Sequence, residues 1–213
     1  MPNTTPLLYK IKLLLMFLMA YSLFYVYPNF SSTGSAVTLN LNWIDLNVPF
    51  MPWTFIVYTS DYYFFAVVIL MLKDKSAFKS FARLMFGTLI VCGMFFIFYP
   101  TTYPRPHYPE VENSLLNFLM KLVGSADTPN NCFPSMHVAL TCSATWSIRS
   151  LGKKHLWFFS IWTFLVILST LTTKQHYLVD IFGGLAVSLF VCSLEKHFCK
   201  ALIVEKNVEK LAL

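Results

Sequence analysis

The sequence predicts an all-α fold, a polytopic membrane helix bundle with six transmembrane helices and both termini in the cytoplasm. The 213-residue chain is 56% hydrophobic and only 12% charged, about half the charged fraction of a typical soluble domain. Six apolar stretches approach the roughly 20 residues that a helix needs to cross a bilayer. Basic residues gather in alternate connections between these stretches. The length and the lack of an internal repeat indicate a single domain over residues 1–213.

The six stretches follow one another along the chain. Lys10 and Lys12 precede the first, Pro100 ends the third, and the fourth is the shortest and most polar. Small residues after the first stretch also allow a cleaved signal peptide. Its roughly 17 apolar residues, however, fit a membrane anchor better than a short signal core. The expected spans cover about residues 11–27, 53–72, 84–99, 134–148, 156–171 and 177–194.

The positive charges set the expected orientation. All but three of the 16 basic residues lie in the two tails or in the connections after the second and fourth stretches. Because cytoplasmic loops carry the excess of Lys and Arg, both termini are predicted to be cytoplasmic. The net charge of +6 is then a membrane signal, and membrane lipids rather than nucleic acid are the expected partners. The three basic residues left on the outer side are Arg105, Lys121 and Lys174.

The first outer connection, about residues 28–52, is too apolar for a free loop. It contains Trp43, Ile44 and Phe50, which indicates that it lies in the membrane interface or folds back against the bundle.

The five cysteines predict neither a disulfide nor a metal site. Only Cys132 falls on the outer side, so it has no partner for an intramolecular disulfide there. No Cys and His spacing resembles a zinc site. We therefore expect no metal and no cofactor, and we interpret Cys132 as a bystander thiol.

Reactive side chains converge at the outer end of the predicted bundle. Arg105 follows the third span, His137 opens the fourth, and His176 and Asp180 open the sixth. His176 and Asp180 are spaced i and i+4, so on a helix they share a face and the carboxylate can orient the imidazole. His137 has no carboxylate at helical spacing and is predicted to donate a proton.

The same end of the bundle predicts an anion site. The fourth and sixth spans both run inward, so their N-termini, with unpaired N–H groups, point to one place. Arg105 and Lys174 add positive charge there. The remaining histidines, His107, His155 and His197, are interpreted as solvated interface residues.

Asp61 falls within the second span, where a carboxylate is costly and is often functional. Two interpretations stay open from the sequence. Either the neighbouring Ser60 and Tyr62 satisfy this carboxylate locally, or it serves the function.

At these residues the sequence resembles the type 2 phosphatidic acid phosphatase superfamily, which includes membrane lipid phosphatases and vanadium haloperoxidases. The resemblance, six helices included, spans most of the chain, and it rests on three motifs within about residues 98–184, each matched in part. The matching stretches run from Tyr103 to Pro106, from Phe133 to His137 with Met136 in place of the family glycine, and from His176 to Asp180, followed by Gly183 and Gly184; Ser169 stands at the third motif's serine position.

Two cationic positions of the family pattern differ here. The first motif's lysine falls on Phe98 and the third motif's arginine on Thr170. Lys174 is a candidate replacement for one of them. These departures, and the stretch from Trp43 to Pro52, resemble the branch of the superfamily that contains inositol phosphorylceramide synthases.

The resemblance implies a role for each matching residue. His176 attacks phosphorus and becomes a phosphohistidine, Asp180 orients it, and His137 protonates the leaving alkoxide. Arg105 and Ser135, through its hydroxyl and backbone N–H, hold the phosphoryl oxygens. The family requires no metal.

The expected function is a membrane lipid phosphate phosphatase of the cell inner membrane, with its active site on the periplasmic or lumenal face. Candidate substrates are phosphatidic acid, phosphatidylglycerol phosphate, a polyprenyl diphosphate and a phosphorylated glycolipid. Two alternatives stay open. One is a phosphotransferase that moves a phospho-headgroup to a lipid or sugar hydroxyl, and the other is a non-catalytic membrane carrier.

Overall fold

Five helical segments in the described part of the chain are long and apolar enough to cross a membrane. The structure, a computed structural model, describes residues 4–31, 36–105 and 107–211, with side chains through residue 201. Pro106, the last residue of the first motif, lies outside the described residues. The five segments are α1 (Leu7–Tyr21) continued by the π-helix η1 (Ser22–Val26) and α2 (Tyr27–Ser31), then α4 (Thr54–Thr59) with α5 (Asp61–Met71), α6 (Lys75–Phe98), α9 (Lys153–Thr172) and α10 (Leu178–Leu211).

The predicted fourth span is a shorter helix at the centre of the bundle. Helix α8 (Met136–Ser147) has 12 residues, of which nine are buried, and the 3-10 helix η2 (Ile148–Leu151) follows it. At 1.5 Å per residue it is about 18 Å long, which is less than the hydrocarbon thickness of a bilayer. Of the six predicted transmembrane helices, five are therefore confirmed as long enough to span, and the fourth, predicted to be the shortest, is a short helix.

Neighbouring helices explain why α8 is both short and polar. It packs against α6, α9 and α10, so its hydroxyls meet other side chains rather than lipid. Ser143 Oγ lies 2.9 Å from Thr88 Oγ1 of α6, and Thr145 Oγ1 lies 2.6 Å from Thr163 Oγ1 of α9. A helix that is surrounded by protein does not need the long apolar surface of a lipid-facing span.

Side-chain caps determine where several helices begin. Asp74 accepts a hydrogen bond from the backbone N–H of Ala77 at 2.9 Å, so α6 begins at Lys75 rather than near residue 84. Ser135 caps α8, and Asn113 caps α7 (Ser114–Ala126). A helix can thus begin among the charged residues before a predicted apolar stretch, because the capping side chain satisfies free N–H groups at the N-terminus.

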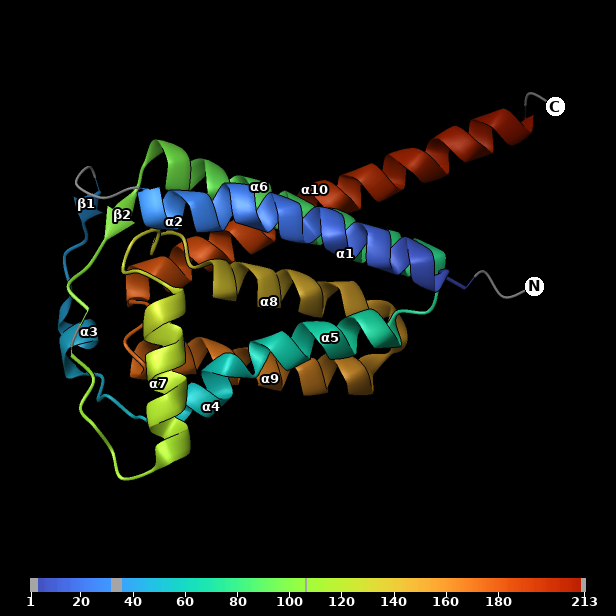
Figure 1. Ribbon diagram of the computed structural model, residues 1–213. Coiled ribbons are helices and arrows are strands. Elements are labelled where there is room, and N and C mark those ends of the chain that lie inside the picture. Colours follow the sequence, from blue (N-terminus) through green and yellow to red (C-terminus); the bar gives the residue numbers. More distant parts are fainter. Residues whose placement is uncertain (1–3, 32–35, 106, 212–213) are drawn as a thin grey trace.

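Both ends of the chain lie at the same end of the bundle, and α10 projects beyond it (Figure 1). The N-terminal segment is tied to the connection between α5 and α6, because the N–H of Thr5 donates to the carbonyl of Lys73 at 2.9 Å. The opposite end carries α3 (Trp43–Asn47), the two short parallel strands β1 (Val37–Thr38) and β2 (Thr101–Thr102), and α7, which runs across the bundle helices (Figure 1).

The apolar connection before the second span folds back against the bundle, as predicted. Asp45 of α3 is buried and its Oδ1 accepts the N–H of Leu178, at the start of α10, at 2.8 Å. The N–H of Met51 donates to the carbonyl of Thr172 at 2.9 Å. Trp43 nevertheless keeps 75% of its surface exposed, which suits a segment that contacts both the bundle and a membrane interface.

Candidate active site

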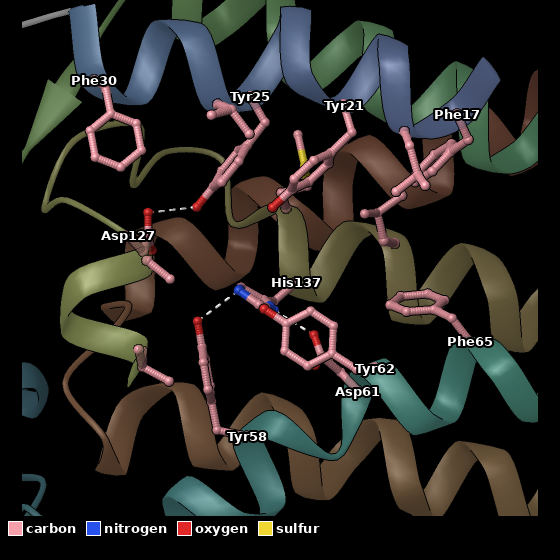
Figure 2. A pocket seen from close by; sticks show the side chains of 16 residues that line it. Phe17, Tyr21, Tyr25, Phe30, Tyr58, Asp61, Tyr62, Phe65, Asp127 and His137 are labelled. Atoms are coloured by element: carbon pink, nitrogen blue, oxygen red, sulfur yellow. Dashed lines mark hydrogen bonds and ion pairs between the residues drawn. The ribbon is translucent and has the colours of Figure 1, made fainter. Parts of the chain in front are cut away.

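His137 is held between two side chains from the second predicted span. Its Nδ1 lies 2.6 Å from Oδ2 of Asp61, and its Nε2 lies 2.6 Å from the hydroxyl of Tyr58 (Figure 2). Asp61 is the first residue of α5 and Tyr58 belongs to α4. The break between these two helices at Ser60 therefore lies beside the N-terminus of α8.

The contact with His137 bears on the two interpretations of Asp61. The carboxylate is 2% exposed and pairs with His137 at a distance typical of a charge-assisted hydrogen bond. Ser60 instead bonds to the carbonyl of Val57 and to the indole N–H of Trp162. The hydrogen-bond partner of Asp61 is thus His137 rather than its neighbour Ser60, and His137, which has no carboxylate at helical spacing, pairs with a distant one. The partner comes from another helix.

His176 and Asp180 form the second imidazole–carboxylate pair. Nδ1 of His176 lies 3.4 Å from Oδ2 of Asp180, and both residues are buried. Because α10 begins at Leu178, His176 lies in the turn before the helix and not on its face as expected. Asp180 Oδ2 also accepts the N–H of Tyr177 at 2.9 Å, so it fixes the start of α10 as well as the imidazole.

The two histidines face each other across the start of α8 and α10. Their ring centroids are 5.9 Å apart at an interplanar angle of 64°. The structure thus brings together two imidazoles, each with its own buried carboxylate, from segments that are 39 residues apart in the chain. One ring can act as a nucleophile while the other transfers a proton.

Two glycines allow the two motifs to pack this closely. The N–H of Ser135 donates to the carbonyl of Asp180 at 3.0 Å. A side chain at Gly184 would place its Cβ 2.6 Å from the carbonyl oxygen of Ser135, and one at Gly183 would clash with the ring of Phe133. The glycine pair after Asp180 is therefore needed for the approach of α10 to the N-terminus of α8.

Arg105 lies in a network formed by backbone carbonyls and the Asp127 carboxylate of the connection after α7. Its Nη1 donates to the carbonyl of Asp127 at 2.6 Å, and its Nη2 lies 3.7 Å from the Asp127 carboxylate. Its Nε is buried without a hydrogen-bond partner among the described residues. Burial alone would lower the pKa of Arg105, but Tyr103 and Asp127 outweigh it and raise the pKa, so the guanidinium stays charged.

Tyr103 links Arg105 to the turn that carries His176. The Arg105 Nη2 lies 3.5 Å from the Tyr103 hydroxyl, which donates to the backbone carbonyl of Gln175. The Tyr103 ring packs edge-on against Tyr177 with centroids 4.7 Å apart. Tyr103 is therefore the side chain that connects Arg105 to the turn of His176.

Lys174 and Ser135, the two other predicted phosphate ligands, have structural contacts. The Lys174 ammonium donates to the carbonyls of Asp45 and Val48 at 2.8 and 2.6 Å, which anchors α3. Burial lowers its pKa, and Asp45 partly opposes that shift. Ser135 is fully buried and accepts the N–H of Val138 at 3.4 Å. Their roles as phosphate ligands stay predictions.

The two positions where the family pattern has cations differ in burial. Phe98, at the end of α6, is 81% exposed, whereas Thr170 is fully buried. The Thr170 carbonyl accepts the N–H groups of Gln175 and His176, both at 3.1 Å. Thr170 thus shapes the His176 turn through its backbone and adds no charge to the site.

Cys132 lies next to these elements with its thiol donating to the hydroxyl of Thr101 at 3.4 Å. Burial and the nearby Asp180 raise the pKa of the Cys132 thiol to about 12. A raised pKa disfavours the reactive thiolate form, which supports the interpretation of Cys132 as a bystander.

Comparison with known proteins agrees with this geometry. A family model described as the PAP2 superfamily matches residues 31–194, which include both histidines and both of their carboxylate partners. No curated protein and no solved structure matches the chain. The paired histidines and the family match together show that the chain belongs to the PAP2, or type 2 phosphatidic acid phosphatase, superfamily.

Proposed function

We propose that this protein is an integral membrane phosphatase that removes phosphate from a lipid phosphate ester or diphosphate. The single observation that carries the proposal is the 5.9 Å separation of the His137 and His176 rings, each ring backed by a buried carboxylate. Membership of the superfamily supports phosphatase or phosphotransferase chemistry. The apolar bundle supports a substrate that resides in the membrane.

The reaction would proceed in two balanced steps. His176 attacks phosphorus through Nε2, the bond from phosphorus to the lipid oxygen breaks, and the leaving oxygen takes a proton derived from His137. Water then attacks the phosphorus of phosphohistidine, the phosphorus–nitrogen bond breaks, and the proton of that water returns to His137. Asp180 stabilises the positive charge on the His176 ring, and Asp61 does the same for His137.

Tyr58 belongs to the proton path in this proposal. The Nε2 of His137 lies 2.6 Å from the Tyr58 hydroxyl, while its Nδ1 is engaged by Asp61. Since both ring nitrogens have partners, a proton leaving Nε2 passes to the Tyr58 oxygen as that hydroxyl gives its own proton onward.

Arg105 would bind the phosphoryl oxygens. Its buried Nε–H has no hydrogen-bond partner among the described residues, and an unpaired buried donor is costly unless a ligand satisfies it. The N-termini of α8 and α10 add further donors near the same place. Charge stabilisation by such fixed groups is the main requirement of phosphoryl transfer.

The proposed topology has six membrane-embedded helices, with both termini cytoplasmic and the histidines at the outer face. The basic residues at the end of the bundle that carries the chain termini support it, because Lys and Arg favour the cytoplasmic side. For a bacterial cell the proposed location is the inner membrane, with the site facing the periplasm.

The test is phosphate release by purified protein from a panel of lipid phosphates, with His176→Ala and His137→Ala as variants. The matched control is His155→Ala, since His155 is an exposed histidine at the opposite end of the bundle. We expect the two site variants to lose activity by at least about 100-fold, the control to keep it, and vanadate to inhibit the wild type. Wild-type release by both variants, without vanadate inhibition, would refute the catalytic assignment of the two histidines. No phosphate release by the wild type from any lipid of the panel would favour the non-catalytic carrier.

A second candidate function is the transfer of a phosphoryl group, or of a whole phospho-headgroup, to the hydroxyl of a lipid or sugar. The observation that favours it is the neutral character of Phe98 and Thr170, where the family pattern has cations. Product analysis with labelled lipid, with and without an added lipid or sugar alcohol, separates the two reactions. Transfer predicts a labelled acceptor product, whereas hydrolysis predicts free phosphate that no acceptor changes.

A further inference from the structure

The segment around α3 packs against the turn that carries His176. Lys174 of this turn donates through its ammonium to the carbonyls of Asp45 and Val48 at 2.8 and 2.6 Å. Leu178, the first residue of α10, donates its N–H to Oδ1 of Asp45 at 2.8 Å. The partners are 126 to 133 residues apart in the chain. The position of the His176 turn therefore depends on a segment that is distant in sequence.

The backbone of this turn needs support from outside. Lys174, two residues before His176, has a φ of +57°, which is the left-handed region that a residue with a side chain adopts at a cost in energy. Such a conformation persists where the surrounding structure holds it in place. The contacts between Lys174 and the carbonyls beside α3 provide that support.

The start of α10 is capped from outside its own sequence. The residue before the helix is Tyr177, which has no short side-chain oxygen of the kind that caps a helix N-terminus. Asp180 accepts the N–H of Tyr177 at 2.9 Å. The N–H of Leu178, one of the groups that a helix cannot pair internally, is satisfied by Asp45. The first turn of α10 is therefore fixed by one carboxylate of its own and one from α3.

Asp45 is itself held in a single orientation. It is 2% exposed, and its Oδ2 accepts the N–H of Asn42 at 3.0 Å while the Asn42 side chain accepts the N–H of Asp45, also at 3.0 Å. This capping box uses one carboxylate oxygen and leaves the other for Leu178. A buried carboxylate needs such partners for both of its oxygens, so α3 and α10 are joined through one side chain.

We propose that Asp45 is a positioning residue for His176. It holds the first turn of α10, and through that turn it keeps the imidazole of His176 at its place opposite His137. Asp45 acts through the N–H of Leu178 and does not contact the phosphate. The inference rests on the proposed function for the role of His176 as nucleophile, and it adds a residue of α3 to the groups on which the reaction depends.

The first experiment compares the loss of two helix caps. Asp45→Ala removes the cap of α10, and Asp74→Ala removes an exposed aspartate that accepts the N–H of Ala77 at the start of α6, at the opposite end of the bundle. The substrate is the lipid phosphate that the wild type hydrolyses fastest. We expect Asp45→Ala to lower kcat about 10- to 100-fold and to leave KM within about twofold, because a displaced nucleophile slows the reaction more than it weakens binding.

The Asp74→Ala protein should keep both constants. Rates are expressed per mole of monodisperse protein, so a variant that only folds less well keeps the wild-type kcat. A wild-type kcat for Asp45→Ala, or a change confined to KM, would overturn the proposal.

The conservative variant Asp45→Asn tests whether the bond to Leu178 carries the effect. Its amide oxygen can still accept the N–H of Leu178, but the amide nitrogen is a donor and cannot replace the second carboxylate oxygen. We expect its kcat to lie between those of the wild type and Asp45→Ala. If Asp45→Ala does not fold, a kcat of Asp45→Asn below the wild-type value supports the proposal and a wild-type kcat overturns it.

Amide hydrogen exchange separates this inference from the proposed function, because it needs no turnover. In Asp45→Ala the N–H groups of residues 176–180 should exchange about tenfold faster or more, whereas Asp74→Ala should change exchange only at the start of α6. Unchanged exchange at residues 176–180 would overturn the inference, whatever the activity. Faster exchange there, in a protein whose wild type releases phosphate from no lipid, would keep Asp45 as the residue that fixes the turn and would refute the phosphatase.

Discussion

The Nδ1 atom of His137 lies 2.6 Å from Oδ2 of Asp61, although 76 residues separate them in the chain. The contact joins the start of α8 to the start of α5 and gives the second histidine its own carboxylate. With the His176–Asp180 pair, the site has two imidazole–carboxylate units rather than one. A carboxylate in the apolar part of a bundle is costly unless it is paired, and this pairing explains its position.

Asp61→Asn should lower kcat by about 100-fold or more, because asparagine keeps the shape but removes the charge that supports a protonated His137. Steady-state phosphate release from a lipid phosphate measures this. Asp74→Asn is the control, since Asp74 is an exposed helix cap at the other end of the bundle. Equal activity of Asp61→Asn and the wild type would remove Asp61 from the proposed mechanism.

Tyr58→Phe should lower kcat about 10- to 100-fold for lipid alkoxide leaving groups. An activated aryl phosphate needs little leaving-group protonation, so its hydrolysis should change much less. Tyr62→Phe is the matched control, because Tyr62 lines the same cavity but is 65% exposed. A loss of the same size with both kinds of leaving group would show that Tyr58 supports the fold or binding and carries no proton.

Gly184→Ala should destabilise the protein by about 1–3 kcal/mol and reduce activity, because the added methyl meets the backbone carbonyl of Ser135. Thermal unfolding in detergent measures the first effect. Gly124→Ala in α7 is the control, as a Cβ there meets nothing within 4 Å and alanine favours a helix. If both variants unfold at the same temperature as the wild type, the close approach of α10 to α8 is not required for stability.

Ser125→Cys in α7 should react with a membrane-impermeant maleimide added outside intact cells, and Lys154→Cys at the start of α9 should not. Both positions are exposed and lie at opposite ends of the bundle, so the pair reports the orientation that the basic residues predict. A protein that lacks its native cysteines provides the background. Labelling of Lys154→Cys alone would show that the orientation in the membrane is the reverse of the predicted one.

Much of the fold could be predicted because membrane helices have a local signature. The length of the apolar stretches predicted five of the helical segments. The basic residues beside these stretches predicted the orientation of the helices. The short α8 could not be predicted as such, since its length depends on being enclosed by α6, α9 and α10. The cap at Asp74 moved the start of α6 outward from the apolar boundary, because capping acts on polar residues that hydropathy leaves out.

The site was predictable where the motif was local. His176 and Asp180 are four residues apart, and their contact follows from spacing even though the helix begins only at Leu178. Asp61 and Tyr58 could not be assigned to His137, because that contact depends on how α4 and α5 pack against α8. The one available signal was a carboxylate within an apolar span, which marks a residue as costly without naming its partner.

The most direct test of the central claim is a rapid-quench experiment with a lipid phosphate labelled on phosphorus. The account predicts an acid-labile, base-stable phosphoryl group on the peptide that contains His176. His176→Ala should abolish the label, and His137→Ala should slow its formation from an alkyl ester. Rapid phosphate release with no phosphorylated histidine, or a label that persists in His176→Ala, would contradict the account.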